Sequence, residues 1–165
     1  MAADLENTLY LDVPAGRVVI EMRPDLAPGH VAQIKALARR GFYDGVPFHR
    51  VIDGFMAQTG DPTGTGTGGS GTKLKAEFSG EKHVRGVVSM ARTPDPDSAD
   101  SQFFIMFAPA PSLDRQYTVW GRVASGMEFI DRVKKGDSAR NGTVQDPDRI
   151  LRMQVAADAD KAGAS

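Results

Sequence analysis

The stretch Phe48-His49-Arg50-Val51-Ile52-Asp53-Gly54-Phe55-Met56-Ala57-Gln58-Thr59-Gly60-Asp61 decides the fold class and indicates where the site lies. It sets one arginine and one glutamine among apolar residues of strand-like composition. Burying a cation is costly unless the cation is paired or has a function. By alternation Asp53 falls on the face opposite Arg50, so no nearby carboxylate is expected to pair with this guanidinium. An arginine at the edge of an apolar hollow suits a substrate carbonyl or amide.

Side chains two residues apart in a strand share a face, and this rule groups the polar residues with apolar ones. The groups are Phe48, Arg50 and Ile52; Met56 and Gln58, with Phe55 brought round by a bend at Gly54; and Gln102, Phe104 and Met106. Two separate strands would then each present an amide beside aromatic or thioether surface. Alternation alone also fits an ordinary β core with polar residues on a solvated face, and both alternatives stay open on this pattern.

Length, charge and composition restrict the class of protein. The 165 residues fit one domain, and the net charge of −1, from 20 basic and 21 acidic residues, gives no basic surface for nucleic acid or an anionic membrane. The chain has no cysteine, which excludes disulfides and thiolate metal sites. Residues 1–7 lack the apolar core of a secretory leader, and no apolar run is long enough to span a bilayer. We therefore expect a cytoplasmic protein without membrane contact.

Periodicity predicts many short strands and two helices. Strands are expected at 8–13, 17–22, 46–52, 55–59, 84–91, 102–107, 117–123 and 149–155. One helix is predicted from Pro28 to a stop at Gly41, and a second after Ser125-Gly126-Met127-Glu128, which has capping-box spacing, ending at Gly136. Seven or eight short strands with only two helices favour a mainly β fold, an antiparallel sheet closed on itself with the helices plugging its ends. We expect one domain over residues 1–157 and a flexible tail over 158–165.

Two loops and three histidines invite other functions, but their patterns are incomplete. The glycine-rich segment 60–72 lacks the Gly-Lys-Ser/Thr ending and helix context of a phosphate-binding loop. Segment 92–100 has three aspartates but not the glycine and distant glutamate of a calcium loop. His30, His49 and His83 have no metal-type spacing, so we expect no metal and interpret them as surface or structural histidines. Trp120 is predicted to be core.

Read together, these segments resemble the cyclophilins, a family of peptidyl-prolyl cis–trans isomerases that bind cyclosporin. The resemblance rests on the opening stretch and continues through Gly66-x-Gly68-Gly69, Met90-Ala91, Ser101 to Ile105, Ser112-Leu113-Asp114 and Tyr117 to Val123. It covers roughly Thr8 to Ala156. The resemblance implies a closed eight-stranded antiparallel barrel capped by two α-helices, which agrees with this count of strands and helices. It also implies isomerisation of X–Pro bonds in proteins and peptides, and a part in protein folding. It implies proline-containing polypeptides as substrates, a monomer, and no cofactor.

Site roles follow from the resemblance, position by position. The catalytic group would be Arg50 with Gln58 and Gln102, the two amides orienting Arg50 and binding substrate backbone. The proline ring would enter a pocket of Phe55, Met56, Phe104 and Leu113, walled by Tyr117. Ala91 and the backbone of Arg92 would hold the residue before proline in an extended pose.

Three residues depart from the common pattern of the family. Tyr117 stands where many members have histidine, and Arg92 replaces the usual asparagine; Tyr117, with Thr59 and the loop over 92–100, resembles bacterial members. Ser112 stands where eukaryotic members commonly carry a tryptophan that contacts cyclosporin, so we expect weak cyclosporin binding. Two alternatives from other classes are a non-catalytic module that grips proline-containing segments, which would not need Arg50, and a glycine-loop nucleotide binder.

Overall fold

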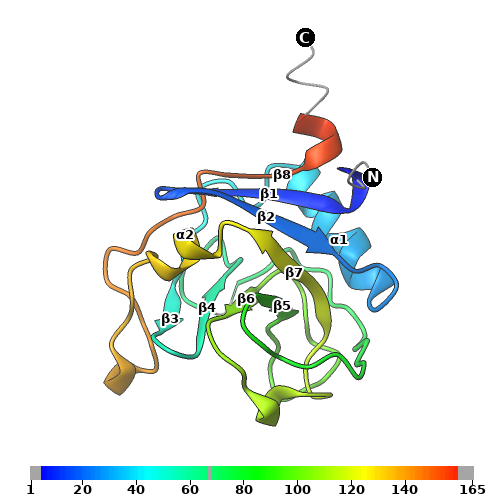
Figure 1. Cartoon of the computed structure of the whole chain (residues 1–165). Helices are drawn as coiled ribbons and strands as arrows, with labels where there is room; N and C mark the ends of the chain where they lie inside the picture. Colours follow the sequence, from blue (N-terminus) through cyan, green and yellow to red (C-terminus); the bar gives the residue numbers. More distant parts are fainter. Residues whose placement is uncertain (1–4, 67, 160–165) are drawn as a thin grey trace.

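The computed structural model describes residues 5–66 and 68–159, which form one eight-stranded sheet with two α-helices (Figure 1). The elements are β1 (Thr8–Val13), β2 (Gly16–Met22), α1 (Pro28–Arg39), β3 (Arg50–Ile52), β4 (Met56–Thr59), β5 (Val87–Met90), β6 (Phe103–Met106), β7 (Val119–Ser125), α2 (Met127–Asp131) and β8 (Arg152–Val155). Short 3-10 helices lie at Leu5–Asn7, Pro111–Leu113 and Ser138–Arg140. The predicted mainly β class is confirmed.

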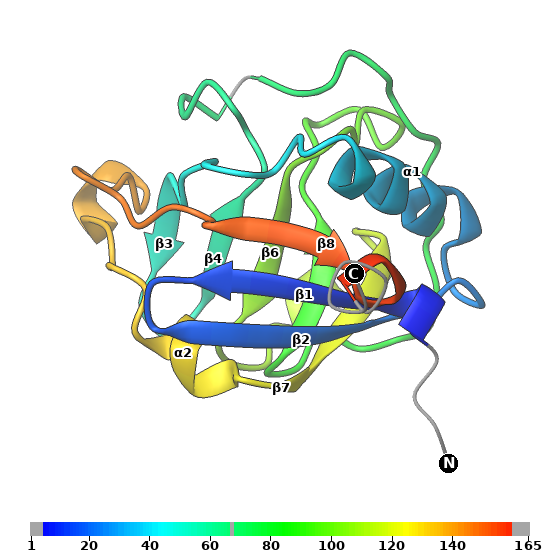
Figure 2. The ribbon, with the colours of Figure 1, turned by 90° about the horizontal axis from the view of Figure 1, so that it is seen from above.

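All strand pairs are antiparallel, in the order β3-β4-β6-β5-β7-β2-β1-β8. The sheet curls strongly, with β8, β1 and β2 side by side in the view of Figure 2 and α1 across one end. Helix α1 packs against β8, and α2 packs against β2. The register shifts between Val88 and Ser89 and between Val19 and Ile20 where these strands meet β7. Such shifts increase local bending and twist, which suits a sheet that curls on itself.

The closed barrel is not confirmed, because the two outer strands β3 and β8 share no ladder. The chain just before β3 does approach the chain just before β8. Pro47 and Arg149 form an isolated bridge, and Phe48 N donates to Asp148 O at 2.9 Å. The architecture is therefore an open, curled antiparallel sheet with a few hydrogen bonds between its edges.

The two faces of the sheet carry different apolar clusters. The larger cluster fills the interior under α1 and includes Phe48, Phe103 and Trp120, each with no exposed surface. The prediction of Trp120 as core is confirmed, and its ring meets Phe103 edge-on at 5.5 Å between centroids. A smaller cluster, containing Met56 and Phe104, lies on the other face. The side chains of the adjacent residues Phe103 and Phe104 therefore lie on opposite faces of the sheet, as strand alternation requires.

The first predicted helix is confirmed and the capping of the second is wrong. Helix α1 buries the predicted stripe Val31, Ile34, Leu37 and Ala38. Helix α2 spans only five residues, and its N-cap is Gly126 at φ +88°, without a side-chain capping bond. A Cβ at Gly126 would lie 2.6 Å from Arg17 O. The close approach of β2 therefore dictates glycine there, and Ser125, which ends β7, does not cap the helix.

The chain end is only partly described. Residues 156–159 are helical, and Asp158 pairs with Arg39 Nε at 3.0 Å. Residues 160–165 of the predicted flexible tail lie outside the described residues. Within the described residues, no helix has the length and apolar character needed to cross a membrane.

Candidate active site

A transverse row of paired residues brings the predicted polar and aromatic groups together. Arg50 on β3 pairs with Gln58 on β4, Gln58 pairs with Phe104 on β6, and Phe104 pairs with Ser89 on β5. Directly opposed residues of antiparallel strands project their side chains on the same face. The register of four strands thus places a guanidinium, an amide and an aromatic ring side by side.

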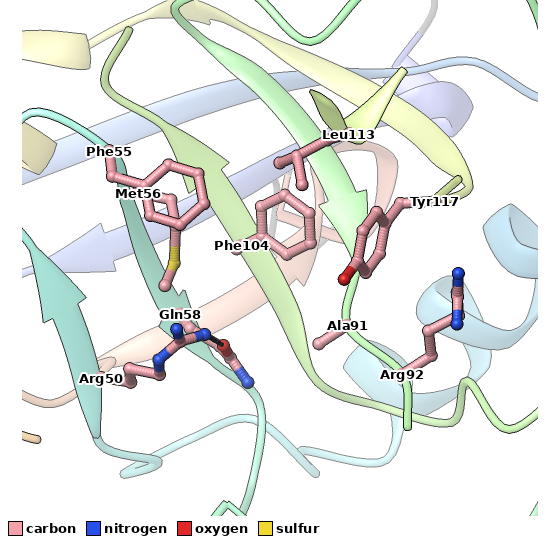
Figure 3. A pocket seen from close by; sticks show the side chains of 9 residues that line it. All are labelled: Arg50, Phe55, Met56, Gln58, Ala91, Arg92, Phe104, Leu113 and Tyr117. Atoms are coloured by element: carbon pink, nitrogen blue, oxygen red, sulfur yellow. Dashed lines mark hydrogen bonds between the residues drawn. The ribbon is translucent and has the colours of Figure 1, made fainter. Parts of the chain in front are cut away.

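This row borders a pocket of about 130 Å³ that collects nine of the ten predicted site residues (Figure 3). Its lining consists of Arg50, Phe55, Met56, Gln58, Ala91, Arg92, Phe104, Leu113 and Tyr117. The tenth, Gln102, lines an adjoining pocket of about 370 Å³, which shares Gln58, Ala91 and Arg92 with the first. The two hollows are therefore neighbouring parts of one surface.

Arg50 is held by neutral partners. Its Nε donates to Asn141 O at 2.9 Å, one terminal nitrogen donates to Asn141 Oδ1 at 3.0 Å, and the other donates to Gln58 Oε1 at 3.1 Å. Within the part of the chain that the structure describes, no carboxylate lies within ion-pair distance of Arg50, in agreement with the absence of a local partner in the sequence. Its positive charge thus remains unneutralised at the pocket edge.

Burial lowers the pKa of Arg50 below its usual 12.5, although the nearby Tyr117 acts in the opposite direction. The group remains a cation at neutral pH, because arginine has an ordinary pKa far above that range. Partial desolvation also strengthens any contact that this cation makes, since the local dielectric constant is lower than in water. The guanidinium has more N–H donors than its three protein bonds use, so it can still donate to a ligand.

Two glutamines form a directional chain of hydrogen bonds behind Arg50. Gln58 accepts from Arg50 through Oε1 and donates through Nε2 to Gln102 Oε1 at 2.9 Å. Gln102 in turn donates to Gly68 O at 3.0 Å. Each amide therefore has one defined orientation, and the far end of the chain is a backbone carbonyl of the glycine-rich loop.

Asp61 organises that loop from inside. This carboxylate has no exposed surface and accepts from Thr63 N, Gly66 N and Gly68 N at 2.6–3.1 Å. Burial would raise the pKa of Asp61, but the hydrogen bonds from Thr63 and the loop N–H groups outweigh it and lower the pKa to about 2. A Cβ at Gly68 would overlap Asp61 Oδ1, so glycine is needed where the loop closes on the carboxylate.

The same bonds argue against a phosphate cradle in segment 60–72. The N–H groups of Gly66, Gly68, Ser70 and Gly71 donate to the carboxylates of Asp61 and Asp100. A phosphate would have to displace these bonds and approach two negative charges. Among residues 5–66 and 68–159, no group of three or more histidine, aspartate or glutamate side chains is arranged to hold a metal ion.

The pocket floor rests on a buried polar group. Phe104 stacks on His83 at 6.1 Å between centroids, and His83 bonds Ser89 Oγ through Nε2 at 3.0 Å and Asp114 Oδ1 through Nδ1 at 3.2 Å. The order Ser-His-Asp resembles a hydrolase triad. However, Ser89 has no exposed surface and its hydroxyl donates to Thr118 O at 2.9 Å. The group therefore supports Phe104 and does not present a nucleophile.

All three histidines are buried, which agrees with the structural alternative of the prediction and not with the surface one. His30 bonds Glu77 Oε1 at 2.6 Å, and His83 is bonded as described above. Neither ring nitrogen of His49 has a hydrogen-bond partner among the described residues. Burial lowers the pKa of each of the three.

Asn141 is the residue at the site that the sequence pattern did not reveal. It lies 91 positions from Arg50 in a turn with φ +61°, on an exposed loop. An asparagine in the left-handed region is a common turn feature and carries no signal of a contact with a distant strand. Only the tertiary fold brings it to Arg50.

A family model described as "Cyclophilin type peptidyl-prolyl cis-trans isomerase/CLD" matches residues 8–155. The chain belongs to the cyclophilins. This cyclophilin is 55% identical over 169 residues to a probable peptidyl-prolyl cis-trans isomerase of Brucella suis, covering 95% of this chain and 86% of the relative.

Solved structures agree with this assignment. A cyclophilin of Hirschia baltica superimposes with a TM-score of 0.84 at 30% identity, covering 96% of this chain and 77% of its own. A cyclophilin-type isomerase of Cryptosporidium parvum, solved in the presence of the dipeptide Ala-Pro, gives 0.82 at 29% identity, covering 90% and 98%. The present cyclophilin is thus a peptidyl-prolyl cis–trans isomerase.

Proposed function

We propose that Arg50 is the catalytic residue with which this isomerase accelerates rotation about X–Pro bonds in polypeptides, and that the enzyme thereby assists protein folding. The observation that carries the proposal is an unneutralised guanidinium, fixed by three hydrogen bonds to neutral partners, at the edge of an apolar pocket. A cation so placed can contact a ligand without first leaving a carboxylate. It is also oriented before the ligand arrives.

The chemistry needs little besides such a donor. Rotation of an X–Pro bond passes a barrier of about 18–20 kcal/mol that arises from amide resonance. At the twisted transition state the prolyl nitrogen becomes pyramidal and gains a lone pair. A guanidinium that donates to this lone pair binds the twisted state better than either planar state, and such differential binding lowers the barrier. The two planar states differ by only about 0.5–1 kcal/mol, so no energy source is required.

The apolar pocket is proposed to hold the proline ring while the preceding carbonyl swings. Phe55, Met56, Phe104 and Leu113 would contact the ring, and Tyr117 would form the wall. The Ala-Pro dipeptide present with the Cryptosporidium parvum relative supports a proline-containing ligand. The volume of about 130 Å³ suits one small side chain rather than a large ligand.

The remaining site residues are proposed to align the substrate backbone. Gln58 and Gln102 would orient Arg50 through their bonded amides and contact the peptide. Ala91 and the backbone of Arg92 would hold the residue before proline in an extended pose. Their position between the two pockets supports this assignment, because a peptide running from one hollow to the other would cross both residues.

Three narrower expectations belong to the same proposal. We propose that the enzyme is a monomer, acts in the cytoplasm, and binds cyclosporin only weakly. The last is supported by Ser112, an exposed small side chain beside Leu113 where an indole would be needed. Light scattering, cell fractionation and titration calorimetry would measure these three properties.

Replacing Arg50 by alanine tests the central role. We expect Arg50→Ala to lower kcat/KM for an X–Pro peptide by at least about tenfold, because the transition state loses its cationic donor. Exchange NMR measures the isomerisation rate without a coupled protease. Arg152→Ala, an exposed arginine on β8 outside the pocket lining, is the matched control and should retain the wild-type rate. A folded Arg50→Ala enzyme with an unchanged rate would exclude this role.

A further inference from the structure

Arg92 lines the pocket, but its charged group does not point into it. Figure 3 shows the guanidinium on the far side of the Tyr117 ring from Arg50, with the Tyr117 oxygen turned toward the hollow. The Arg92 Cζ lies 4.8 Å from the centroid of the Tyr117 ring and 5.8 Å from that of Phe78. A guanidinium at such a distance over an aromatic face is attracted by the ring.

The Arg92 guanidinium is fixed in this place by backbone carbonyls. Nε and one terminal nitrogen both donate to Gln116 O, at 2.9 and 2.7 Å, and the other terminal nitrogen donates to Thr93 O at 2.9 Å. In the described part of the chain no carboxylate pairs with Arg92. Its full charge therefore faces the ring. The bonds also tie the chain after β5 to the residue directly before Tyr117.

Tyr117 needs such support because it lies in a loop. The preceding residues include Arg115 at φ +64°, and the next strand, β7, begins only at Val119. On its inner side the ring meets Phe104 edge-on at 5.6 Å and His83 at 6.4 Å. The hydroxyl makes no hydrogen bond to any described residue and is available to a ligand. Without Arg92, the outer face of this half-buried ring would lose its contact with a guanidinium that is fixed by hydrogen bonds.

We propose that Arg92 is a positioning residue that acts through Tyr117: it holds the tyrosine ring as the pocket wall, with the hydroxyl turned inward. This inference rests on the proposed use of the pocket in catalysis. The wall contacts the proline ring alike in the planar and twisted states. Loss of its support therefore weakens substrate binding more than it slows the bound reaction.

The test is a mutant cycle read in both KM and kcat. We expect Arg92→Met to raise KM about two- to fivefold and to leave kcat within about twofold, the size expected for one exposed cation–π contact. Arg92→Lys should recover only part of the loss, since an ammonium cannot donate twice to Gln116 O in a planar fork. Arg17→Met is the matched control, because Arg17 stacks on Tyr10 at 4.4 Å on the β1–β2 hairpin, outside the pocket lining. It should leave KM unchanged.

The second arm separates positioning from direct contact with substrate. The Arg92→Met effect should persist in a Tyr117→Phe background, which keeps the ring, and vanish in a Tyr117→Leu background, which removes it. The chain has three tyrosines, so ring resonances of Tyr117 can be assigned by NMR and should shift in Arg92→Met. An unchanged KM in Arg92→Met, or a loss that persists with Tyr117→Leu, would overturn the inference. Arg50→Ala is measured in parallel and tests the proposed catalytic role of Arg50. A wrong inference about Arg92 can therefore be distinguished from a wrong proposal about Arg50.

Discussion

At the scale of single residues, the site depends on how a mobile cation is immobilised. An arginine side chain loses up to about 2 kcal/mol of rotamer entropy when it is fixed. In this enzyme the loss is offset by bonds to Asn141 and Gln58, both neutral, so the charge is not cancelled as it would be by a carboxylate. Fixing the donor before substrate binds reduces the reorganisation needed in the transition state.

Asn141 offers a test of this immobilisation. Asn141→Gly keeps a residue that tolerates φ +61° and removes the side chain with its Oδ1 acceptor, while the backbone carbonyl that accepts from Arg50 Nε stays. We expect kcat to fall about three- to tenfold with little change in KM, since hydrogen bonds to a charged group are stronger than neutral ones. Asp146→Gly, at another non-glycine position with positive φ (+49°), is the control and should keep the wild-type kcat. Equal kcat values for the two variants would show that the Asn141 side chain does not align Arg50.

At the scale of elements, the hairpin β3–β4 and the loop over 60–72 act together on the same side chains. The hairpin sets Arg50 opposite Gln58, and the loop supplies the Gly68 carbonyl that holds Gln102. Because the amide chain is directional, a displacement of Gly68 removes the acceptor that fixes Gln102, and then the bond that fixes Gln58. Hydrogen bonds thus connect the loop to Arg50 on β3.

Asp61→Asn tests that link. One carboxylate oxygen accepts from Gly66 N and Gly68 N, and an amide NH₂ in its place cannot accept. Leaving buried donors unpaired costs about 1–3 kcal/mol each, so we expect a lower free energy of unfolding and a kcat/KM reduced several-fold. Hydrogen exchange at Gly66 and Gly68 should accelerate. Asp95→Asn, an exposed carboxylate that accepts one backbone N–H, is the control. Unaltered exchange at Gly66 and Gly68 in Asp61→Asn would refute the link.

At the scale of the whole molecule, stability is tied to three buried histidines. Burial lowers the pKa of His30, His49 and His83 below the usual 6.5. At pH values below 6.5 but above the lowered pKa values, the unfolded chain therefore binds more protons than the folded chain. Stability rises with pH wherever the unfolded state binds more protons, so this contribution is complete above about pH 6.5 and is lost as the pH falls.

We accordingly expect the free energy of unfolding, measured with urea, to decrease from about pH 7.5 to about pH 5. Asp61, with a pKa lowered to about 2, adds to acid sensitivity only below its usual value of 3.8, so the two windows are separate. His49→Gln removes one titrating group whose ring nitrogens have no hydrogen-bond partner among the described residues, and should make the decrease shallower. A free energy of unfolding that stays constant over this range would contradict the expectation.

Strand alternation predicted the fold class and much of the pocket, because both depend on a period of two residues. Arg50, Gln58 and Phe104 lie in one row, and the bend at Gly54 brings Phe55 to the same hollow, as expected. Several strands are shorter than predicted: β3 keeps only Arg50–Ile52 of the segment 46–52. In that segment Phe48 lies in the main core and not beside Arg50, since it precedes the regular ladder.

What could not be predicted depends on contacts between distant segments. The capping-box spacing near Ser125 failed because β2 passes too close to Gly126 for a side chain, which no local pattern reveals. Asn141 and the stacking of Arg92 on Tyr117 likewise require the folded chain. A local motif predicts which side chains can meet within a strand pair. Tertiary packing decides which side chains from distant segments also contact them.

The location of Trp120 determines how the enzyme can be observed by optical spectroscopy. It is the single tryptophan, has no exposed surface, and packs on Phe103 in the interior, whereas the pocket is built on the opposite face around Phe104. We therefore expect its fluorescence to monitor the integrity of the core and to change little when the pocket is occupied. The native indole signal and catalytic turnover are therefore independent readouts, and a variant that alters one without the other can be classified directly.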